Sequence, residues 1–184
     1  MKKIRLPLDE KTIHELKAGD EVLLTGTVYT ARDAAHKRLV ALIEKGEPLP
    51  IELSGQTIYY VGPAPAKPGY AIGSAGPTSS YRMDIYTPPL LKLGLKGMIG
   101  KGRLGPNTMK AMVECGAVYF GAVGGSAVLI SKSIKKAEVV AYPDLGAEAI
   151  HRFEVEDLPA VVCVDADGRN LYNEGTKLYK QAAL

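Results

Sequence analysis

The stretch EVLLTGTVYT (Glu21–Thr30) is followed by ARDAAHKRLVALIEK (Ala31–Lys45) and then by Gly46. The first stretch is rich in β-branched side chains, which predicts a strand. In the second stretch apolar residues recur at helical spacing, and a glycine ends the pattern, so we expect a helix over Arg32–Lys45. A strand that leads directly into a helix is the unit from which α/β proteins are built.

The same alternation continues along the chain. Strands are expected at 57–62, 97–100, 117–122, 137–142 and 160–165, and helices at 10–17, 78–86, 106–114 and 174–184, with two more that begin at Thr87 and after residues 124–126. Residues 63–69 are expected to form a loop, because three of them are prolines. The pattern predicts a single α/β domain over residues 1–184 with a mixed or parallel sheet, in which about 173–184 form a weakly held tail helix.

The composition excludes several classes of protein. Hydrophobic residues make up 46% of the chain and charged residues 23%, as in an ordinary globular protein. The net charge of +3 is small and no block of Lys and Arg occurs, which argues against nucleic acid as a partner. No apolar run approaches a membrane span, and the first residues show no secretory signal. We therefore expect a cytoplasmic protein with no membrane partner.

The two cysteines, Cys115 and Cys163, lie far apart in the sequence and in apolar surroundings. We expect both to be reduced thiols of the core. Two thiols cannot supply the three or four ligands of an iron–sulfur cluster, nor a four-thiolate zinc site. Any metal that takes part in the function must therefore be held largely by groups other than these two thiols.

The segment SAGPTSSYRMD (residues 74–84) holds the first candidate site residues. Pro77 suits the first position of a helix, so we expect a helix that begins there, with Thr78 at its N-terminus and Arg82 one turn later on the same face. Free backbone N–H groups and a guanidinium can bind a carboxylate or phosphate. The alternative is an ordinary capped helix with a surface arginine.

Two further cations stand where α/β proteins place ligands, directly after predicted strands. Arg32 lies at the start of a helix, where a positive charge opposes the helix dipole at a cost of a few tenths to about 1 kcal/mol. Such a conflict is more common at functional sites, although a surface pair with Asp33 or another acid would also explain it. Lys101 stands between two glycines that let the backbone approach an anion closely; the alternative is a solvated loop lysine.

Other residues near these cations could support them. His36 lies in the first turn of the predicted helix after Arg32, and a catalytic role, a place on the helix surface and a place behind the site all remain open. Gly124 and Gly125 open another helix; they resemble a weak anion cradle, and close packing of helix on strand explains them equally well. From the residues alone we predict a clamp for a small dianion.

Five motifs, in order, resemble the class I iron–sulfur hydro-lyases, which comprise the class I fumarases and the L-tartrate dehydratases. They are YTARDAAHKR (29–38), YVGP (60–63), GPT with RMD (76–84), GMIGKG (97–102) and AVGGSA (122–127). The similarity runs from about Leu6 to Tyr172. Because the chain begins near the start of this region, it resembles the separate β subunit, equivalent to the C-terminal domain of fused forms.

The resemblance implies a fold, a cofactor and a partner. The fold would be a swivelling β/β/α domain with a mixed sheet flanked by helices. The cofactor would be a [4Fe–4S] cluster bound by three cysteines of a partner α subunit, with no metal on this chain. The fourth iron of the cluster, which has no protein ligand, would act as a Lewis acid on the substrate. The active enzyme would then be a hetero-oligomer.

The resemblance also assigns roles. Arg32 and Arg82 correspond to the carboxylate-binding arginines, Lys101 to a substrate-binding lysine, and Thr78 to the proposed catalytic base, while Asp33, His36, Gly124 and Gly125 would support them. The expected activity is the reversible hydration of fumarate to malate. The alternatives are the β subunit of L-tartrate dehydratase, which forms oxaloacetate, and a dicarboxylate-binding module without catalysis. A nucleotide-binding domain is excluded because no glycine-rich phosphate loop follows a strand.

Overall fold

The computed structural model describes residues 1–122 and 127–181, with side chains of the last helix as far as Thr176. Within these residues seven strands form one sheet in the order β1-β2-β3-β4-β5-β7-β6, and β2 pairs with β7 as well. The strands are β1 (Lys2–Arg5), β2 (Glu21–Thr30), β3 (Thr57–Tyr59), β4 (Gly97–Gly100), β5 (Val118–Gly121), β6 (Ile134–Ala141) and β7 (Ile150–Val164).

The additional pairing closes five of these strands into a small barrel. Strands β2, β3, β4 and β5 are parallel neighbours, and β7 runs antiparallel to both β5 and β2. Strand β1 extends the sheet beside the first half of β2, and β6 extends it beside β7. The four parallel strands therefore present their carboxyl ends at one edge of the barrel.

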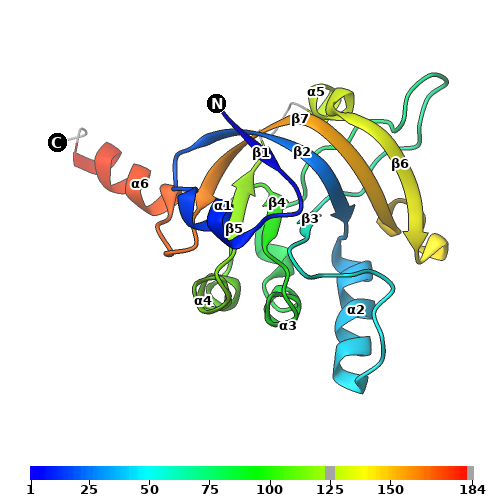
Figure 1. Cartoon of the computed structure of the whole chain (residues 1–184), viewed down its shortest axis with the longest axis horizontal. Helices are drawn as coiled ribbons and strands as arrows, with labels where there is room; N and C mark the ends of the chain where they lie inside the picture. The colour runs from blue at the N-terminus through cyan, green and yellow to red at the C-terminus, as the bar shows by residue number, and fades with distance from the viewer. Residues whose placement is uncertain (123–126, 182–184) are drawn as a thin grey trace.

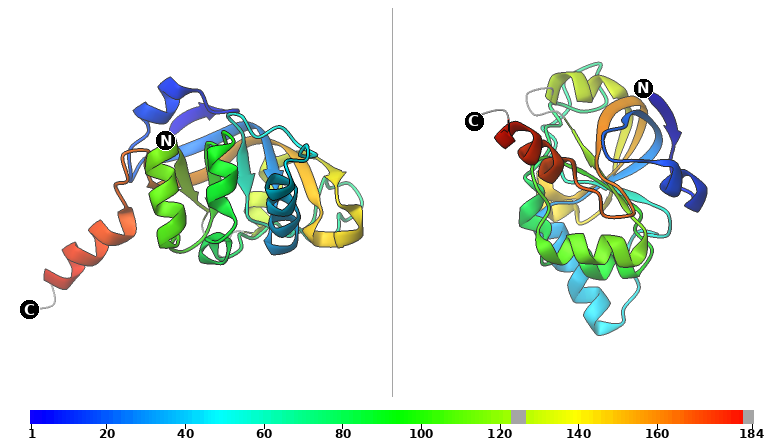
Figure 2. Two further views of the ribbon diagram at one scale, coloured as in Figure 1. Left: turned by 90° about the horizontal axis from the view of Figure 1, so that it is seen from below. Right: turned by 90° about the vertical axis from the view of Figure 1, so that its left-hand side faces the viewer.

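Helices flank this sheet (Figure 1). They are α1 (Glu10–Glu15), α2 (Asp33–Lys45), α3 (Thr87–Lys92), α4 (Pro106–Cys115), α5 (Ala127–Ser133) and α6 (Leu171–Gln181), with two 3₁₀ helices, η1 (Ser80–Met83) and η2 (Pro143–Glu148). Helices α2, α3 and α4 stand in a row on one side of the barrel, whereas α6 projects from the body towards the C-terminus (Figure 2). None of the described helices combines the length and the apolar character needed to cross a bilayer.

Among the residues that the structure describes, two hydrophobic clusters form the core. One fills the barrel and includes Val28, Phe120 and Phe153; the other lies between the barrel and the row of helices and includes Met98 and Tyr119. Successive residues of a strand point to opposite faces, so Tyr119 and Phe120 enter different clusters. Burial on both faces explains why the central strands are continuously apolar in sequence.

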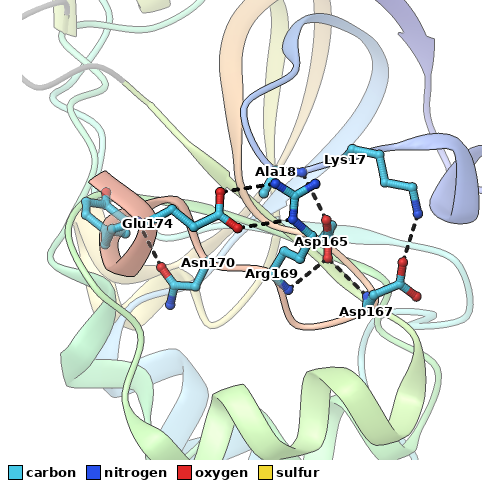
Figure 3. A network of polar contacts seen from close by, with 8 residues as sticks. Lys17, Ala18, Asp165, Asp167, Arg169, Asn170 and Glu174 are labelled. Atoms are coloured by element: carbon cyan, nitrogen blue, oxygen red, sulfur yellow. Dashed lines mark hydrogen bonds and ion pairs between the residues drawn. The ribbon is translucent and has the colours of Figure 1, made fainter. Parts of the chain in front are cut away.

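A polar network joins the two ends of the chain (Figure 3). The buried Asp165 carboxylate accepts backbone N–H groups from Ala18 at 3.0 Å, Asp167 at 3.2 Å and Arg169 at 3.0 Å. Lys17 pairs with Asp167 at 2.8 Å. These bonds satisfy a buried charge and fasten the turn after β7 to the loop before β2.

The structure confirms the predicted fold class, an α/β domain with a mixed sheet flanked by helices. The strand–helix unit β2–α2 has the predicted bounds, apart from Arg32, which is the N-cap rather than the first helical residue, and Gly46 ends α2 in the left-handed conformation. The swivelling character of the domain, its extent as one unit over 1–184 and the weak attachment of its tail remain predictions.

The sequence analysis misses one strand, and two of its predicted elements are wrong in extent or type. Strand β1 was not expected, and β7 begins at Ile150 rather than at residue 160. Charged side chains and Pro159 disguise the first part of β7, which is stabilised by pairing with β6, its neighbour in the sequence, and with β2 far away in the sequence. The helix expected at 78–86 is instead an extended segment followed by the short helix η1.

Candidate functional site

The segments singled out in the sequence meet at the carboxyl edge of the parallel strands. Arg32 follows β2, Gly62 follows β3 and Lys101 follows β4. The fourth segment follows β5, and its glycines, Gly124 and Gly125, lie outside the described residues. Open crevices at this edge are where α/β sheets bind ligands, because the loops after neighbouring strands converge there.

Arg32 lies partly buried between three elements. Its Nε is 3.3 Å from Oε1 of Glu148 and 4.0 Å from Oδ2 of Asp33. The side chain crosses Gly62 so closely that a Cβ at that position would lie 3.0 Å from its Cδ and Nη1. The pairing with acids that the sequence left open is therefore real, but it occurs at a semi-buried edge and leaves the Arg32 guanidinium beside the strand ends.

Arg82 is held by the same aspartate. Its Nε donates to Oδ1 of Asp33 at 3.1 Å, and its Nη2 lies 3.0 Å from Oδ2. Asp33 thus stands between the two guanidinium groups, with Glu148 on the far side of Arg32. Two arginines and two carboxylates form an alternating array, which fixes the spacing of the cations. The Arg82 side chain is 53% exposed and can still be reached from solvent.

Thr78 does not begin a helix, contrary to the prediction. Its N–H donates to the carbonyl of Tyr60 at 2.6 Å, and the residues on either side form bridges, Pro77 with Val61 and Ser79 with Lys101. A helix N-terminus binds anions only with unpaired N–H groups. Because the N–H of Thr78 is paired with the carbonyl of Tyr60, directly after β3, the expected anion site at a helix N-terminus does not form there.

Lys101 lies directly beside this segment. Its N–H donates to the Thr78 carbonyl at 3.3 Å, and its carbonyl accepts the Ser80 N–H at 2.9 Å. Glycine is required at the two flanking positions for different reasons. A Cβ at Gly100 would collide with the Ser80 hydroxyl, and Gly102 has a positive φ of 73°. The close approach of this backbone to an anion stays a prediction, and the side chain of Lys101 is exposed at the same edge.

His36 is buried behind Arg32, so the place on the helix surface is wrong. Its Nδ1 lies 2.9 Å from the Arg32 carbonyl, which can only accept, so Nδ1 carries the hydrogen. Its Nε2 is buried and has no hydrogen-bond partner among the described residues. The ring contacts Tyr60 edge-on, with centroids 5.4 Å apart. Burial lowers the pKa of His36 to about 4, so the imidazole is neutral near pH 7.

Sequence reasoning missed two residues that shape this site. Glu148 stands at the end of η2, far along the chain from Arg32, and no motif marks it. Asp84 is buried and accepts hydrogen bonds from the N–H of Thr108 at 2.8 Å and the side chain of Asn107 at 2.9 Å. It caps α4 from outside that helix. The one sequence signal that could have pointed to Asp84 was its place at the end of the RMD motif in residues 76–84.

Neither of the two cysteines belongs to a group of side chains that could bind a metal ion within the described residues. Cys163 is buried, and burial raises the pKa of its thiol; Cys115 is only partly buried, so the core position expected for it is only partly realised. Across residues 1–122 and 127–176, no three side chains of His, Cys, Asp or Glu are grouped so that they could hold a metal ion. The described part of the chain therefore does not fit the thiolate set that an iron–sulfur cluster requires.

The family model described as "Fumarase C-terminus" matches residues 1–175. The chain belongs to this family. It is 44% identical over 153 residues to the anaerobic class I fumarate hydratase of Escherichia coli (strain K12), covering 82% of this chain and 28% of that protein. It is 37% identical over 175 residues to fumarate hydratase 2 of Leishmania major, covering 93% of this chain and 31% of that protein.

A relative of similar size has a different name. The putative L(+)-tartrate dehydratase subunit beta of Methanocaldococcus jannaschii is 36% identical over 176 residues, which cover 92% of this chain and 90% of that protein. The chain thus spans less than a third of the length of the two fumarate hydratases and nearly all of the tartrate dehydratase subunit. The resemblance to the hydro-lyases that the motifs indicated is confirmed.

Proposed function

We propose that this member of the fumarase C-terminus family is the carboxylate-binding subunit of a two-component hydro-lyase that interconverts fumarate and malate. The observation that supports it is that Arg32 and Arg82 share the Asp33 carboxylate, while the backbone of Lys101 pairs with that of Thr78, at the edge of the parallel strands. The three cations exceed the two carboxylates, Asp33 and Glu148, by one positive charge, which favours an anionic ligand at this edge.

In this proposal the chain's own residues bind and orient the substrate. Forked guanidinium groups suit carboxylates, and their fixed spacing through Asp33 would hold both ends of the substrate. Removal of a proton beside a carboxylate builds negative charge on that carboxylate, which Arg32, Arg82 and Lys101 would stabilise. Thr78 is our candidate for the base; without a helix dipole, it would depend on the nearby cations to activate its hydroxyl.

The proposal requires a partner, an α subunit in a hetero-oligomer of the cytoplasm. An iron–sulfur cluster held there would supply a Lewis acid for the departing hydroxide. Two observations support such a partner: the described residues offer no ligand set of their own, and Tyr81 and Ile85, close to Arg82 in sequence, are 64% and 68% exposed. Large exposed apolar side chains beside a polar site are typical of a surface that another protein covers.

The second candidate is the β subunit of an L-tartrate dehydratase. It is favoured by the match over 90% of a subunit with that name. Tartrate is also a four-carbon dicarboxylate, so the same arginine clamp would serve. Nothing in the array of Arg32, Asp33 and Arg82 distinguishes a substrate with one more hydroxyl.

Anaerobic co-expression with the candidate α chain tests both. Fumarate absorbance is followed with malate, and oxaloacetate formation with tartrate, using each chain alone and the two together. Malate turnover that needs both chains supports the fumarase proposal. Turnover of tartrate alone supports the second candidate. Inactivity with both substrates, despite an intact cluster, would contradict catalysis and leave a dicarboxylate-binding module.

A further inference from the structure

We infer that Glu148 is a positioning residue for the Arg32 guanidinium, an inference that rests on the proposed function for its catalytic consequence. Arg32 Nε is buried and, among the described residues, has no aligned hydrogen bond, so its orientation depends on nearby charge and packing. Oε1 of Glu148, at 3.3 Å, is nearer than the aspartate oxygen at 4.0 Å. Glu148 is therefore the nearer counter-ion of this arginine.

The contact is directional. Glu148 faces the Nε edge of Arg32, while the Nη1 side rests on Gly62, where a Cβ would lie 3.0 Å away. The Glu148 carboxylate on one side and the Gly62 backbone on the other favour a single orientation of the planar Arg32 guanidinium. An arginine held in this way loses less conformational entropy when it binds a substrate carboxylate.

Glu148 is itself held in place by contacts of η2 with α2. Arg38 of α2 donates to both carboxylate oxygens of Asp144, at 2.9 and 2.5 Å, and its guanidinium lies 5.0 Å from the centroid of the Tyr142 ring. At the other end of η2, the Thr30 hydroxyl donates to the Ala149 carbonyl at 3.3 Å. The segment that carries Glu148 is thus fastened on both sides to the β2–α2 unit that carries Arg32.

The catalytic consequence is tested in the two-chain enzyme. We expect Glu148→Gln to raise KM for the dicarboxylate about tenfold and to change kcat by less than about threefold, as loss of uniform substrate binding predicts. In an Arg32→Ala background the same substitution should have no further effect, because Glu148 acts only through Arg32. Glu156→Gln removes a carboxylate that pairs with Lys135 at 3.7 Å and should leave KM unchanged.

The positioning itself is tested without turnover. The Arg32 Nε–H signal in a nitrogen–proton NMR spectrum of this chain is assigned by its loss in Arg32→Lys. We expect Glu148→Gln to move this signal and to speed its exchange with solvent, and Glu156→Gln to leave it in place. An unmoved signal, or additive effects of the Arg32 and Glu148 substitutions on KM, would overturn the inference. A moved signal in an enzyme that turns over neither malate nor tartrate would support the positioning and reject the proposed function.

Discussion

The buried His36 should make the stability of the protein fall in mild acid by a predictable amount. Burial lowers its pKa to about 4 in the folded chain, against an ordinary value of 6.5. Above pH 6.5 the imidazole is neutral in both states. As the pH falls from 6.5 towards 4, the unfolded chain binds a proton that the folded chain does not bind, so the free energy of unfolding decreases. Between about pH 7.5 and pH 5 these two pKa values give a loss of about 2 kcal/mol.

His36→Gln removes the titrating ring and retains a side-chain N–H that can reach the Arg32 carbonyl. The free energy of unfolding of both proteins is measured by urea denaturation at several pH values. Groups present in both, such as His151, whose pKa burial also lowers, cancel in the difference. We expect the difference between wild type and variant to change by about 2 kcal/mol across this range, with the wild type losing more. If the free energies of unfolding of the two proteins changed in parallel with pH, the conclusion that His36 is buried and neutral would be refuted.

The remaining predictions concern the site and the cysteines. Gly62→Ala should raise KM about tenfold in the two-chain enzyme, because the new Cβ would lie only 3.0 Å from Cδ and Nη1 of Arg32 and would push that side chain aside. Gly175→Ala is the matched control, because no atom lies within 4 Å of its Cβ. Equal KM values for the two variants would contradict the close packing of Arg32 on Gly62. Cys115→Ser and Cys163→Ser should leave the iron and sulfide content of the co-expressed enzyme unchanged, and loss of iron from either variant would place a cluster ligand on this chain.

Local sequence signals predicted the parts of the fold that local chemistry determines. β-Branched residues fix β2, and Gly46, with its positive φ, ends α2. Asp9 caps α1, the helix expected at 10–17, by accepting the N–H of Thr12 at 2.7 Å. Each of these features depends on residues within one or two turns of each other.

Distant contacts determine what the sequence could not show. The segment at Thr78 is extended because its N–H finds the Tyr60 carbonyl, so Pro77, a sound helix-start signal, is overridden. In the site, Arg32 and Lys101 were singled out because cations directly after strands are conspicuous, and Arg82 because it follows Thr78 at helical spacing. Glu148 was not, because only the closed barrel and the fastening of η2 bring it to Arg32.

The central claim is that the cations at the strand edge bind the substrate, and one comparison tests it most directly. Arg82→Ala and Arg169→Ala are assayed in the two-chain enzyme under anaerobic conditions. Both arginines are about half exposed, and each contacts both oxygens of a carboxylate, of Asp33 or Glu174. We predict that Arg82→Ala lowers kcat/KM about a hundredfold or more, whereas Arg169→Ala changes it less than about twofold. Near-normal kinetics for Arg82→Ala would contradict the account.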